Sequence, residues 1–263
     1  MRCTCVRLLS VSLFAAMAWQ LHAQQPSAPA TVGDPLSLVH RFFPFHVGDR
    51  LTYRLTGEQE IGSREQAHTV PMSGDYTETV VAIRRIRRTV ELVEIERKGK
   101  SGAYANCDSE DLNQPETRFW YVLSPRAVIV SCEHEEAMKL ALELSESPSR
   151  GVKEYEDGYL LPFKVGMTWG TDPGEPKRAD QMYRWVVMER TGITVSAGKF
   201  PNCYEMTYRT LPDDEEKWVC EGAGLAKDDY EHHGTTRKYR IELVSAVAAP
   251  MSSASGLRQH MNR

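Results

Sequence analysis

Four tryptophans are the side chains of this sequence best suited to bind a ligand. Trp120, Trp169, Trp185 and Trp218 each fall in a segment whose apolar and aromatic content predicts a strand. Aromatic side chains on the concave face of a curved sheet can line a cavity for an apolar molecule. Tryptophans on strands also fill ordinary hydrophobic cores, and the sequence leaves that alternative open. The chemistry expected of these four residues is binding, with no reaction.

A run of arginines forms the second candidate site. Arg84, Arg85, Arg87 and Arg88 surround Ile86 in a chain whose formal net charge is −4. Such a cluster can contact phosphate head groups or the acidic surface of a partner. A solvated turn between two strands, or a sheet edge protected by charge from mispairing, explains the same residues. The four arginines are therefore candidates for contact with an anionic partner.

Histidines and carboxylates are plentiful but form no familiar catalytic or metal-binding motif. His232 and His233 follow the acidic run 228–231, a composition that suits zinc. Neighbouring residues on a strand point to opposite faces, so the two histidines are not expected to share an ion. Residues 133–136 lack the H-E-x-x-H spacing, and the chain lacks nucleophile elbows and phosphate-binding loops. We expect no metal, cofactor or catalytic residue; a hydrolase that uses scattered histidines and carboxylates is the alternative.

Residues 1–23 have the features of a secretory signal peptide. Arg2 and Arg7 make a short positive region, and the apolar run 8–19 is too short to span a bilayer. Ala23 provides a small residue at the cleavage point. A buried N-terminal helix is the alternative. The signal predicts an exported protein, periplasmic or secreted, and because no second run approaches spanning length, we expect no transmembrane segment in the mature chain.

The cysteines that remain after residue 23 are Cys107, Cys132, Cys203 and Cys220. An even number in an exported chain favours two disulfides. Two strands around the turn at 211–214 place Cys203 opposite Cys220, at the separation that a disulfide needs. Cys107 then pairs with Cys132 by elimination. The same register places Glu205 opposite Trp218 and Tyr208 opposite Glu215. A four-cysteine metal site is the alternative, although the usual C-x-x-C spacing is missing.

Short segments rich in Val, Ile and Thr, separated by turn signals, predict a mainly β protein. About ten strands at this spacing indicate a single antiparallel curved sheet or a partly closed barrel. Residues 133–146 are strong helix formers with acids at the start, so we expect one minor helix there. Leu140, Leu142 and Leu144 alternate, which leaves a strand open. The expected strands are 50–58, 75–85, 89–97, 118–123, 127–132, 183–195, 203–209, 216–220 and 237–247.

Composition divides the chain into four parts. Residues 1–23 are the signal peptide, and residues 24–38, rich in Pro, Ala and Ser, are expected to form a flexible leader. Residues 39–247 are expected to form one β domain. Residues 248–263 are small and polar and are expected to form a disordered tail.

A short pattern occurs twice along the chain. Residues 43–48 read FPFHVG and residues 161–166 read LPFKVG, and an aromatic residue follows each copy, Tyr53 in the first and Trp169 in the second. Proline fixes the entry of the chain, and glycine permits a turn conformation that other residues resist. Each copy is therefore expected to form a loop that leads into a core strand.

These motifs resemble those of a group of bacterial exported proteins and lipoproteins of unknown function, called TapB-like. The group shares a P-[FL]-x-V-G-x-x-W start, a second copy in mid-chain, and two later segments, V-x-A-G-x-F-x-N-C and G-x-G-L-x-K, which match residues 195–203 and 222–227. The resemblance covers residues 42–247 and implies an all-β, curved-sheet envelope protein, similar in outline to lipoprotein carriers. The chain departs from the pattern at Leu51, where the group has Trp, and in lacking the cysteine that would carry a lipid.

Together these features predict an exported envelope protein without enzymatic activity. Its expected partner is a lipid or another apolar or amphiphilic small molecule, or a second envelope protein. A purely structural interaction module is an alternative, besides the hydrolase. Because the chain is mildly acidic, with a net charge of −4, it lacks the positive surface of a general nucleic-acid binder, and we expect no nucleic-acid partner.

Overall fold

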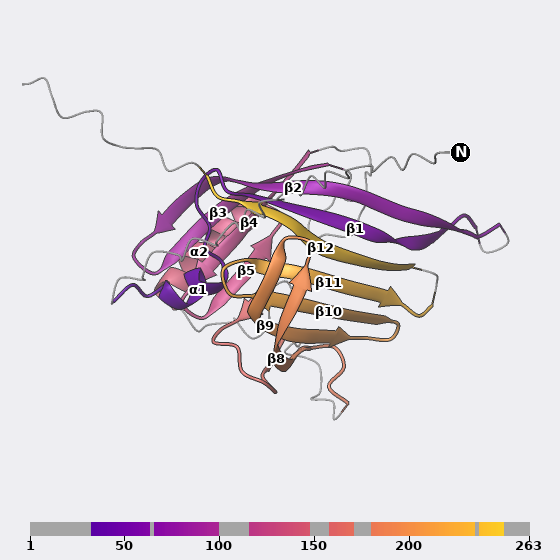
Figure 1. The fold of residues 1–263 in the computed structure, drawn as a ribbon. Helices are drawn as coiled ribbons and strands as arrows, with labels where there is room; N and C mark the ends of the chain where they lie inside the picture. Colours follow the sequence, from indigo (N-terminus) through magenta and orange to yellow (C-terminus); the bar gives the residue numbers. More distant parts are fainter. Residues whose placement is uncertain are drawn as a thin grey trace, which may run out of the picture.

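The computed structural model describes residues 33–63, 66–99, 116–147, 158–170, 180–234 and 237–249. Within them lie two helices, α1 (Ser37–Phe42) and α2 (His134–Glu146), and twelve strands (Figure 1). The strands are β1 (Arg50–Ile61), β2 (His68–Ile86), β3 (Val90–Gly99), β4 (Glu116–Ser124), β5 (Ala127–Ser131), β6 (Gly158–Leu160), β7 (Thr168–Trp169), β8 (Trp185–Val195), β9 (Gly198–Arg209), β10 (Asp213–Cys220), β11 (Gly224–His232) and β12 (Arg237–Val247).

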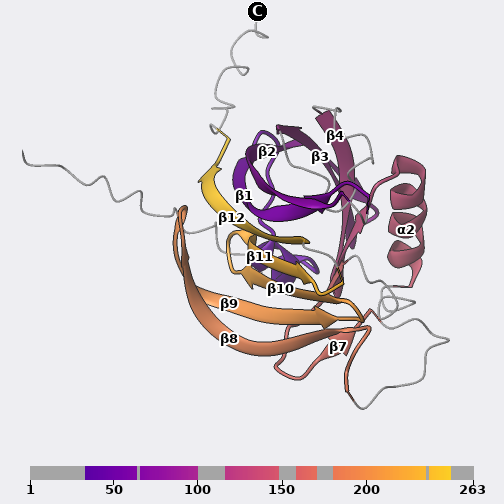
Figure 2. The same cartoon turned by 90° about the vertical axis from the view of Figure 1, so that its right-hand side faces the viewer.

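All twelve strands belong to one antiparallel sheet that curls into a nearly closed barrel (Figures 1 and 2). The order β6-β5-β4-β3-β2-β1-β12-β11-β10-β9-β8-β7 contains two meanders, β1 to β6 and β7 to β12, which join where β1 pairs with β12. Successive side chains of a strand point to opposite faces, so one face of each strand lines the interior. The expected fold class, a mainly β protein with one antiparallel curved sheet or partly closed barrel, is confirmed.

The two edges of the sheet meet at a seam between β6 and β7. These strands are the ends of the sheet order, yet residues 161–167 alone connect them in the chain. The indole Nε1 of Trp169 donates a hydrogen bond to the Gly158 carbonyl, 2.9 Å away. The Leu161 amide donates to the Arg126 carbonyl at 2.7 Å, which fixes the connecting loop to the β4–β5 turn. Side-chain and loop contacts therefore close the barrel at this seam.

The two copies of the repeated pattern form loops that share three backbone hydrogen bonds. In the first copy the Asp49 amide donates to the His46 carbonyl at 2.9 Å, and the Gly48 amide donates to the Val80 carbonyl at 2.8 Å. The Val80 amide returns a hydrogen bond to the Asp49 carbonyl at 3.0 Å, so the loop is bonded to β2 just before β1 begins. Gly48 and Gly166 have φ of 92° and 81°, which explains why glycine occupies this position in both copies. The second copy makes the same contacts with Lys164, Gly166, Met167 and Val187 in place of His46, Gly48, Asp49 and Val80.

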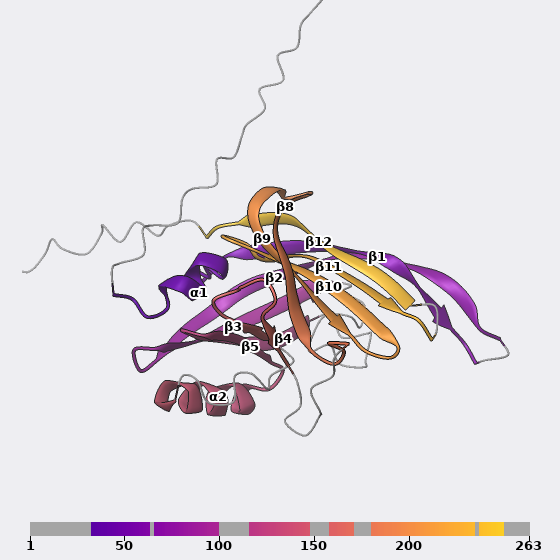
Figure 3. The same cartoon turned by 90° about the horizontal axis from the view of Figure 1, so that it is seen from below.

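Helix α1 and the two repeat loops fill one end of the barrel, which we call the plugged end. The strand directions place the β2–β3, β4–β5, β8–β9 and β10–β11 turns at this end. On one side Asp34, just before α1, pairs with Arg85 at 3.0 Å. On the other side Arg41 pairs with Glu221 at 2.8 Å, and its carbonyl accepts a hydrogen bond from the Gly222 amide. α1 is therefore fastened to two turns that lie far apart in the sheet order (Figure 3).

Buried side chains form three groups. The first fills the interior beside α1, and the second lies between β1, β2, β12 and the tip of the β8–β9 hairpin. The third joins α2 to the outer face of β3, β4 and β5 (Figure 2). α2 contributes Ala137, Leu140, Ala141 and Leu144 to it, which is the apolar stripe of an amphipathic helix, whereas Leu142 is 46% exposed. The helix expected at 133–146 is thus confirmed over the strand alternative.

The expected pairing of two cysteines is also confirmed. β9 and β10 pair so that Cys203 faces Cys220, Glu205 faces Trp218 and Tyr208 faces Glu215, as the sequence predicts. Cys203 and Cys220 form a disulfide. Cys132 is also disulfide-bonded, and its expected partner Cys107 lies outside the described residues.

Both ends of the chain fall mainly outside the described residues. This holds for the expected signal peptide at 1–23, for most of the leader at 24–38 and for most of the tail at 248–263. In the part that is described, Leu36 is fully buried before α1 begins. After β12, the Ala249 amide donates to Asp49 Oδ1 at 2.9 Å, so the chain there still contacts the first repeat loop.

Candidate ligand-binding interior

Two of the four candidate tryptophans lie together inside the barrel. The rings of Trp169 and Trp185 stack with centroids 6.2 Å apart, and the residues are 2% and 4% exposed. The Lys217 ammonium lies 4.7 Å from the Trp185 ring centroid, a cation–π contact. The interior therefore combines large aromatic surfaces with a buried charge.

The other two tryptophans lie on outer faces. Trp120 packs against α2, with its ring 5.4 Å from that of His134. Trp218 points to the face of β10 opposite Lys217, and the Lys227 ammonium lies 3.9 Å from its ring centroid. The structure therefore brings Trp169 and Trp185 together and separates Trp120 and Trp218 from them.

A buried ion pair joins β2 and β3 in the interior. Arg97 donates to Glu78 Oε1 from Nη2 at 2.8 Å and from Nε at 3.1 Å, and the two residues are 5% and 7% exposed. The guanidinium also lies over the rings of Tyr76 and Phe119, 5.2 and 4.6 Å from their centroids. These contacts offset much of the cost of removing both charges from water.

A second interior cluster, which we call the Asp228 cluster, consists of Glu215, Lys217 and Asp228. Lys217 faces Asp228 in the β10–β11 ladder, and its Nζ lies 2.7 Å from Glu215 Oε1. Asp228 is 4% exposed, and within the described part of the chain its buried Oδ1 has no hydrogen-bond partner. Nearly all buried polar atoms in proteins are hydrogen-bonded. Asp228 is therefore a buried interior group that needs explanation.

Burial and neighbouring charges shift the pKa values in and around this cluster. Burial raises the pKa of the Asp228 carboxyl well above its usual value, and the Glu215 charge acts in the same direction. Burial alone would lower the pKa of Lys217, but Glu215 and Asp228 hold it above its usual range. Burial also raises the pKa of Tyr159 to about 12, with Lys217 opposing that shift. The cluster thus contains a charged lysine, Lys217, and a carboxyl that resists ionisation, Asp228.

Among the described residues, four tyrosines that pack beside α1 in the interior are not fully buried. They pack against the buried group beside α1, yet each keeps part of its surface accessible. The ring of Tyr208, for example, lies 5.3 Å from that of Trp185. We call the four the interior tyrosines: Tyr121, Tyr159, Tyr204 and Tyr208.

The four candidate arginines lie at the plugged end, around the β2–β3 turn. Arg85 pairs with Glu91 at 3.2 Å and with Asp34 at 3.0 Å. Arg87 pairs with Glu146 of α2 at 2.9 Å. Arg84 and Arg88 are exposed. Two of the four arginines therefore already bind carboxylates of this chain, and two present their side chains to solvent.

The histidines after β11 do not converge on a common point. His233 Nε2 lies 3.1 Å from Asp214 Oδ2, whereas His232 Nδ1 accepts a hydrogen bond from the Gly234 amide at 3.0 Å. Among the described residues, no three His, Cys, Asp or Glu side chains are placed to hold a metal ion. Asp228, which belongs to the same acidic run, points into the barrel instead.

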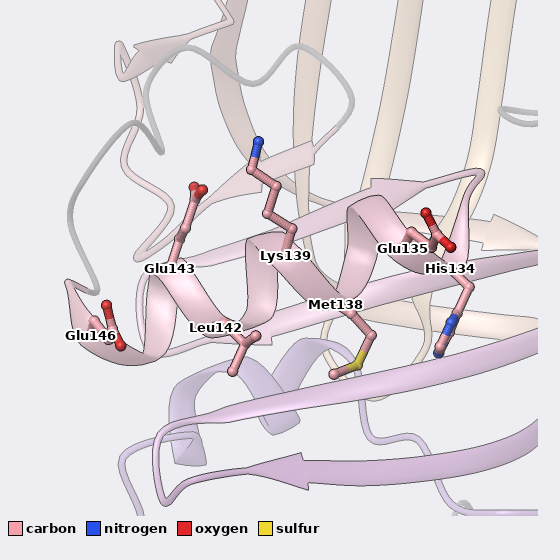
Figure 4. Close-up of a pocket in the computed structure, with 7 residues that line it drawn as sticks. All are labelled: His134, Glu135, Met138, Lys139, Leu142, Glu143 and Glu146. Atoms are coloured by element: carbon pink, nitrogen blue, oxygen red, sulfur yellow. The ribbon is translucent and has the colours of Figure 1, made fainter.

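A hollow of about 600 Å³ lies on the solvent side of α2 (Figure 4). In Figure 4, Met138 and Leu142 project to one side of the helix, while Lys139 and Glu143 project to the other. None of the candidate tryptophans or arginines lines this hollow. Its lining residues all belong to α2: His134, Glu135, Met138, Lys139, Leu142, Glu143 and Glu146.

Sequence reasoning missed the Asp228 cluster as a site, although one signal was available. The expected register places Trp218 and Cys220 on one face of their strand, so Glu215, Lys217 and Val219 must share the other face. Because disulfides and tryptophans are usually buried, the sequence suggests that their face is the inner one. In the structure the charged face is the interior one.

Comparison with known proteins gives distant likenesses. No protein-family model matches the chain, and no curated protein matches it. One similar solved structure comes from Bacteroides fragilis and is provisionally named an exported protein with a YmcC-like fold. It is 12% identical, with a TM-score of 0.42, and the match covers 79% of this chain and 99% of that one. Another, provisionally named a lipoprotein, comes from Parabacteroides distasonis; it is 9% identical, with a TM-score of 0.38, and covers 77% and 96%. The TapB-like resemblance stays a prediction.

None of the helices in the described ranges combines the length and the apolar character needed to cross a membrane.

Proposed function

We propose that this is an exported protein without enzymatic activity that binds an amphiphilic small molecule inside its barrel. Export is supported by the signal-like residues 1–23 and by the Cys203–Cys220 disulfide, since disulfides persist in oxidising compartments. The observation that carries the binding proposal is the set of interior tyrosines, which pack against the core and are only partly buried. A ligand covering these rings would bury aromatic surface while their hydroxyls offer hydrogen bonds.

In this proposal the plugged end determines through which end of the barrel a ligand would enter. α1 is held by ion pairs on both sides of that end, and Phe43 and Phe163 belong to the buried group beside it. A ligand would therefore enter from the opposite end and reach the interior tyrosines, with Trp169 and Trp185 beneath them. Trp120 and Trp218, on outer faces, would take no part.

Binding of a neutral fluorescent naphthylamine probe tests this proposal on the full mature chain. Trp185→Leu should weaken probe binding about fivefold, because it removes the ring on which Tyr208 packs and an aromatic contact is worth about 1 kcal/mol. Trp120→Leu, the same substitution on an outer face, should leave it unchanged. Urea unfolding checks that both variants fold. Native mass spectrometry of protein from an envelope extract supplies a second test: a chain that carries no lipid and takes up no probe contradicts the proposal.

A second candidate function, contact with an anionic surface, is favoured by the charges at the plugged end. Arg84 and Arg88 are exposed there, and so are Arg126 in the β4–β5 turn and Lys164 in the second repeat loop. Positive side chains grouped at one end of a molecule attract phosphate-bearing lipid surfaces within a Debye length. This contact would leave the interior free for a ligand.

Sedimentation with vesicles that contain anionic lipid tests the second candidate. Replacing Arg84 and Arg88 with Gln should reduce binding several-fold at low salt, and high salt should abolish the difference. Arg54→Gln is the control, because Arg54 is exposed but pairs with Asp75 on the sheet. Equal binding by the wild type and the Arg84/Arg88 variant excludes the arginine turn as a contact.

A further inference from the structure

We propose that the Asp228 cluster binds the ammonium group of a cationic amphiphile, whose apolar part lies against the interior aromatic rings. This inference rests on the proposed ligand-binding interior and adds the charge of the ligand. It assigns to Asp228 the role of anionic partner for the ligand, beside a Lys217–Glu215 pair that is already neutral.

The first argument is that the Asp228 carboxyl has no counterion. Lys217 and Glu215 neutralise each other directly, with 2.7 Å between Nζ and Oε1. Lys217 forms no ion pair with Asp228 within 4 Å in the described structure, although the two residues face each other across the ladder. A cationic ligand would supply the counterion that lets Asp228 ionise, whereas an anionic ligand would oppose its ionisation.

The second argument is the buried atom without a partner. Oδ1 of Asp228 is shielded from solvent and accepts no hydrogen bond from any described residue. An ammonium group carries three N–H donors and no acceptor, so it can donate to this oxygen without introducing a new unpaired acceptor. A hydroxyl could also donate, but the charge-assisted bond is roughly twice as strong.

The third argument is the way this interior already accommodates cations. The Lys217 ammonium lies 4.7 Å from the Trp185 ring centroid, and the Arg97 guanidinium lies 4.6 Å from that of Phe119. Two further rings lie in the field of Asp228, since its charge contributes to raising the pKa values of Tyr159 and Tyr239. A ligand cation beside Asp228 would therefore lie in an interior rich in aromatic side chains, whose ring faces attract positive charge.

The charges of the wider interior also favour a positively charged ligand. Among the described residues, the buried charged side chains are three carboxylates, from Glu78, Glu91 and Asp228, and two cations, from Arg97 and Lys217. Both of these cations are already paired, so a carboxylate or phosphate ligand would have to compete with a carboxylate of the protein for either of them. The chemistry that fits is a primary amine or a similar cation attached to an apolar chain or ring.

Three ligands that differ in one functional group test the inference: octylammonium, octanol and octanoate, each used to displace the neutral probe from the full mature chain. The wild type should bind octylammonium at least about tenfold more tightly than octanol, and octanoate most weakly. Asp228→Asn should remove the preference for octylammonium over octanol. Asp229→Asn, at the outward-facing neighbour that pairs with Arg240 and Lys227, should keep the preference.

The outcomes separate this inference from the proposed function. Equal affinity for all three compounds, a preference for octanoate, or a preference that survives in Asp228→Asn overturns the assignment of an amine, while probe binding still supports a ligand-binding interior. If neither probe nor any octyl compound binds, both proposals fail. Calorimetry in buffers of different ionisation enthalpy gives an independent readout: binding of octylammonium should release protons from Asp228 in the wild type and release none in Asp228→Asn.

Discussion

Removing one partner of the buried Arg97–Glu78 pair should destabilise the protein far more than removing both. Arg97→Met leaves the Glu78 carboxylate buried and unpaired, at a cost of about 3–5 kcal/mol, and also removes the contacts with the Tyr76 and Phe119 rings. Glu78→Gln combined with Arg97→Met removes both charges, so much of that cost should be recovered. Urea unfolding, with the midpoint compared at constant m, measures both losses.

The same substitution at the surface provides the control. Arg54 makes a two-pronged pair with Asp75 through Nε and Nη2, both at 2.9 Å, but the two side chains are 51% and 48% exposed. Arg54→Met should therefore change the urea midpoint little. A double variant at the buried pair that loses as much stability as the sum of its single variants would refute the reasoning, because it would show that the two charges act independently.

Three further predictions concern the disulfide, a repeat loop and a surface histidine. The Cys203→Ala/Cys220→Ala double variant should lose about 3 kcal/mol of unfolding free energy, given the separation of 17 residues; an unchanged urea midpoint would contradict this. Gly166→Ala should cost about 1 kcal/mol from its φ of 81° alone, since no atom lies within 4 Å of the new Cβ, and urea unfolding shows whether it does. Asp214 raises the pKa of His233, so this pair stabilises the fold below the ordinary pKa of histidine, and the effect disappears as pH rises through the raised value; NMR titration should show that pKa fall in Asp214→Asn.

The parts of the fold that the sequence predicts well are those set by local chemistry. The β9–β10 register follows from two cysteines and a turn, and every pair expected from it is present. α2 follows from helix formers with acids in the first turn, Glu135 and Glu136. The arginine turn between β2 and β3 follows from charged residues between two apolar runs. In each case the deciding residues lie within about twenty positions of one another.

The parts that escape prediction depend on distant contacts. β11 is not anticipated, because Asp228 replaces the apolar residue expected at an inward position, and Gly222 and Gly224 around its start suggest a bend. β6 and β7 are too short to show periodicity, and the Trp169 hydrogen bond that brings their edges together depends on closure of the whole sheet. α1 is short and begins at the end of the segment where composition suggests a leader, and its ion pairs join it to turns remote in the chain. Separating Trp169 and Trp185 from the other tryptophans likewise requires knowing which face of each strand is concave.

The two interior clusters bury charge in different ways, and stability should reveal the difference. The Arg97–Glu78 pair is complete, whereas the Asp228 carboxyl has an oxygen without a partner. Burial raises the pKa of Asp228, so the folded state binds its proton more tightly than the unfolded state, and stability should fall as pH rises from the ordinary pKa of Asp toward the raised value.

Asp228→Asn should therefore stabilise the ligand-free protein at neutral pH, by about 1 kcal/mol or more, and flatten its stability across that pH range, as urea midpoints at several pH values would show. A buried group that costs the fold stability is expected at a site kept for binding. If Asp228→Asn instead destabilises the protein at every pH, the carboxyl is a structural acceptor, and the case for a ligand cation beside it fails.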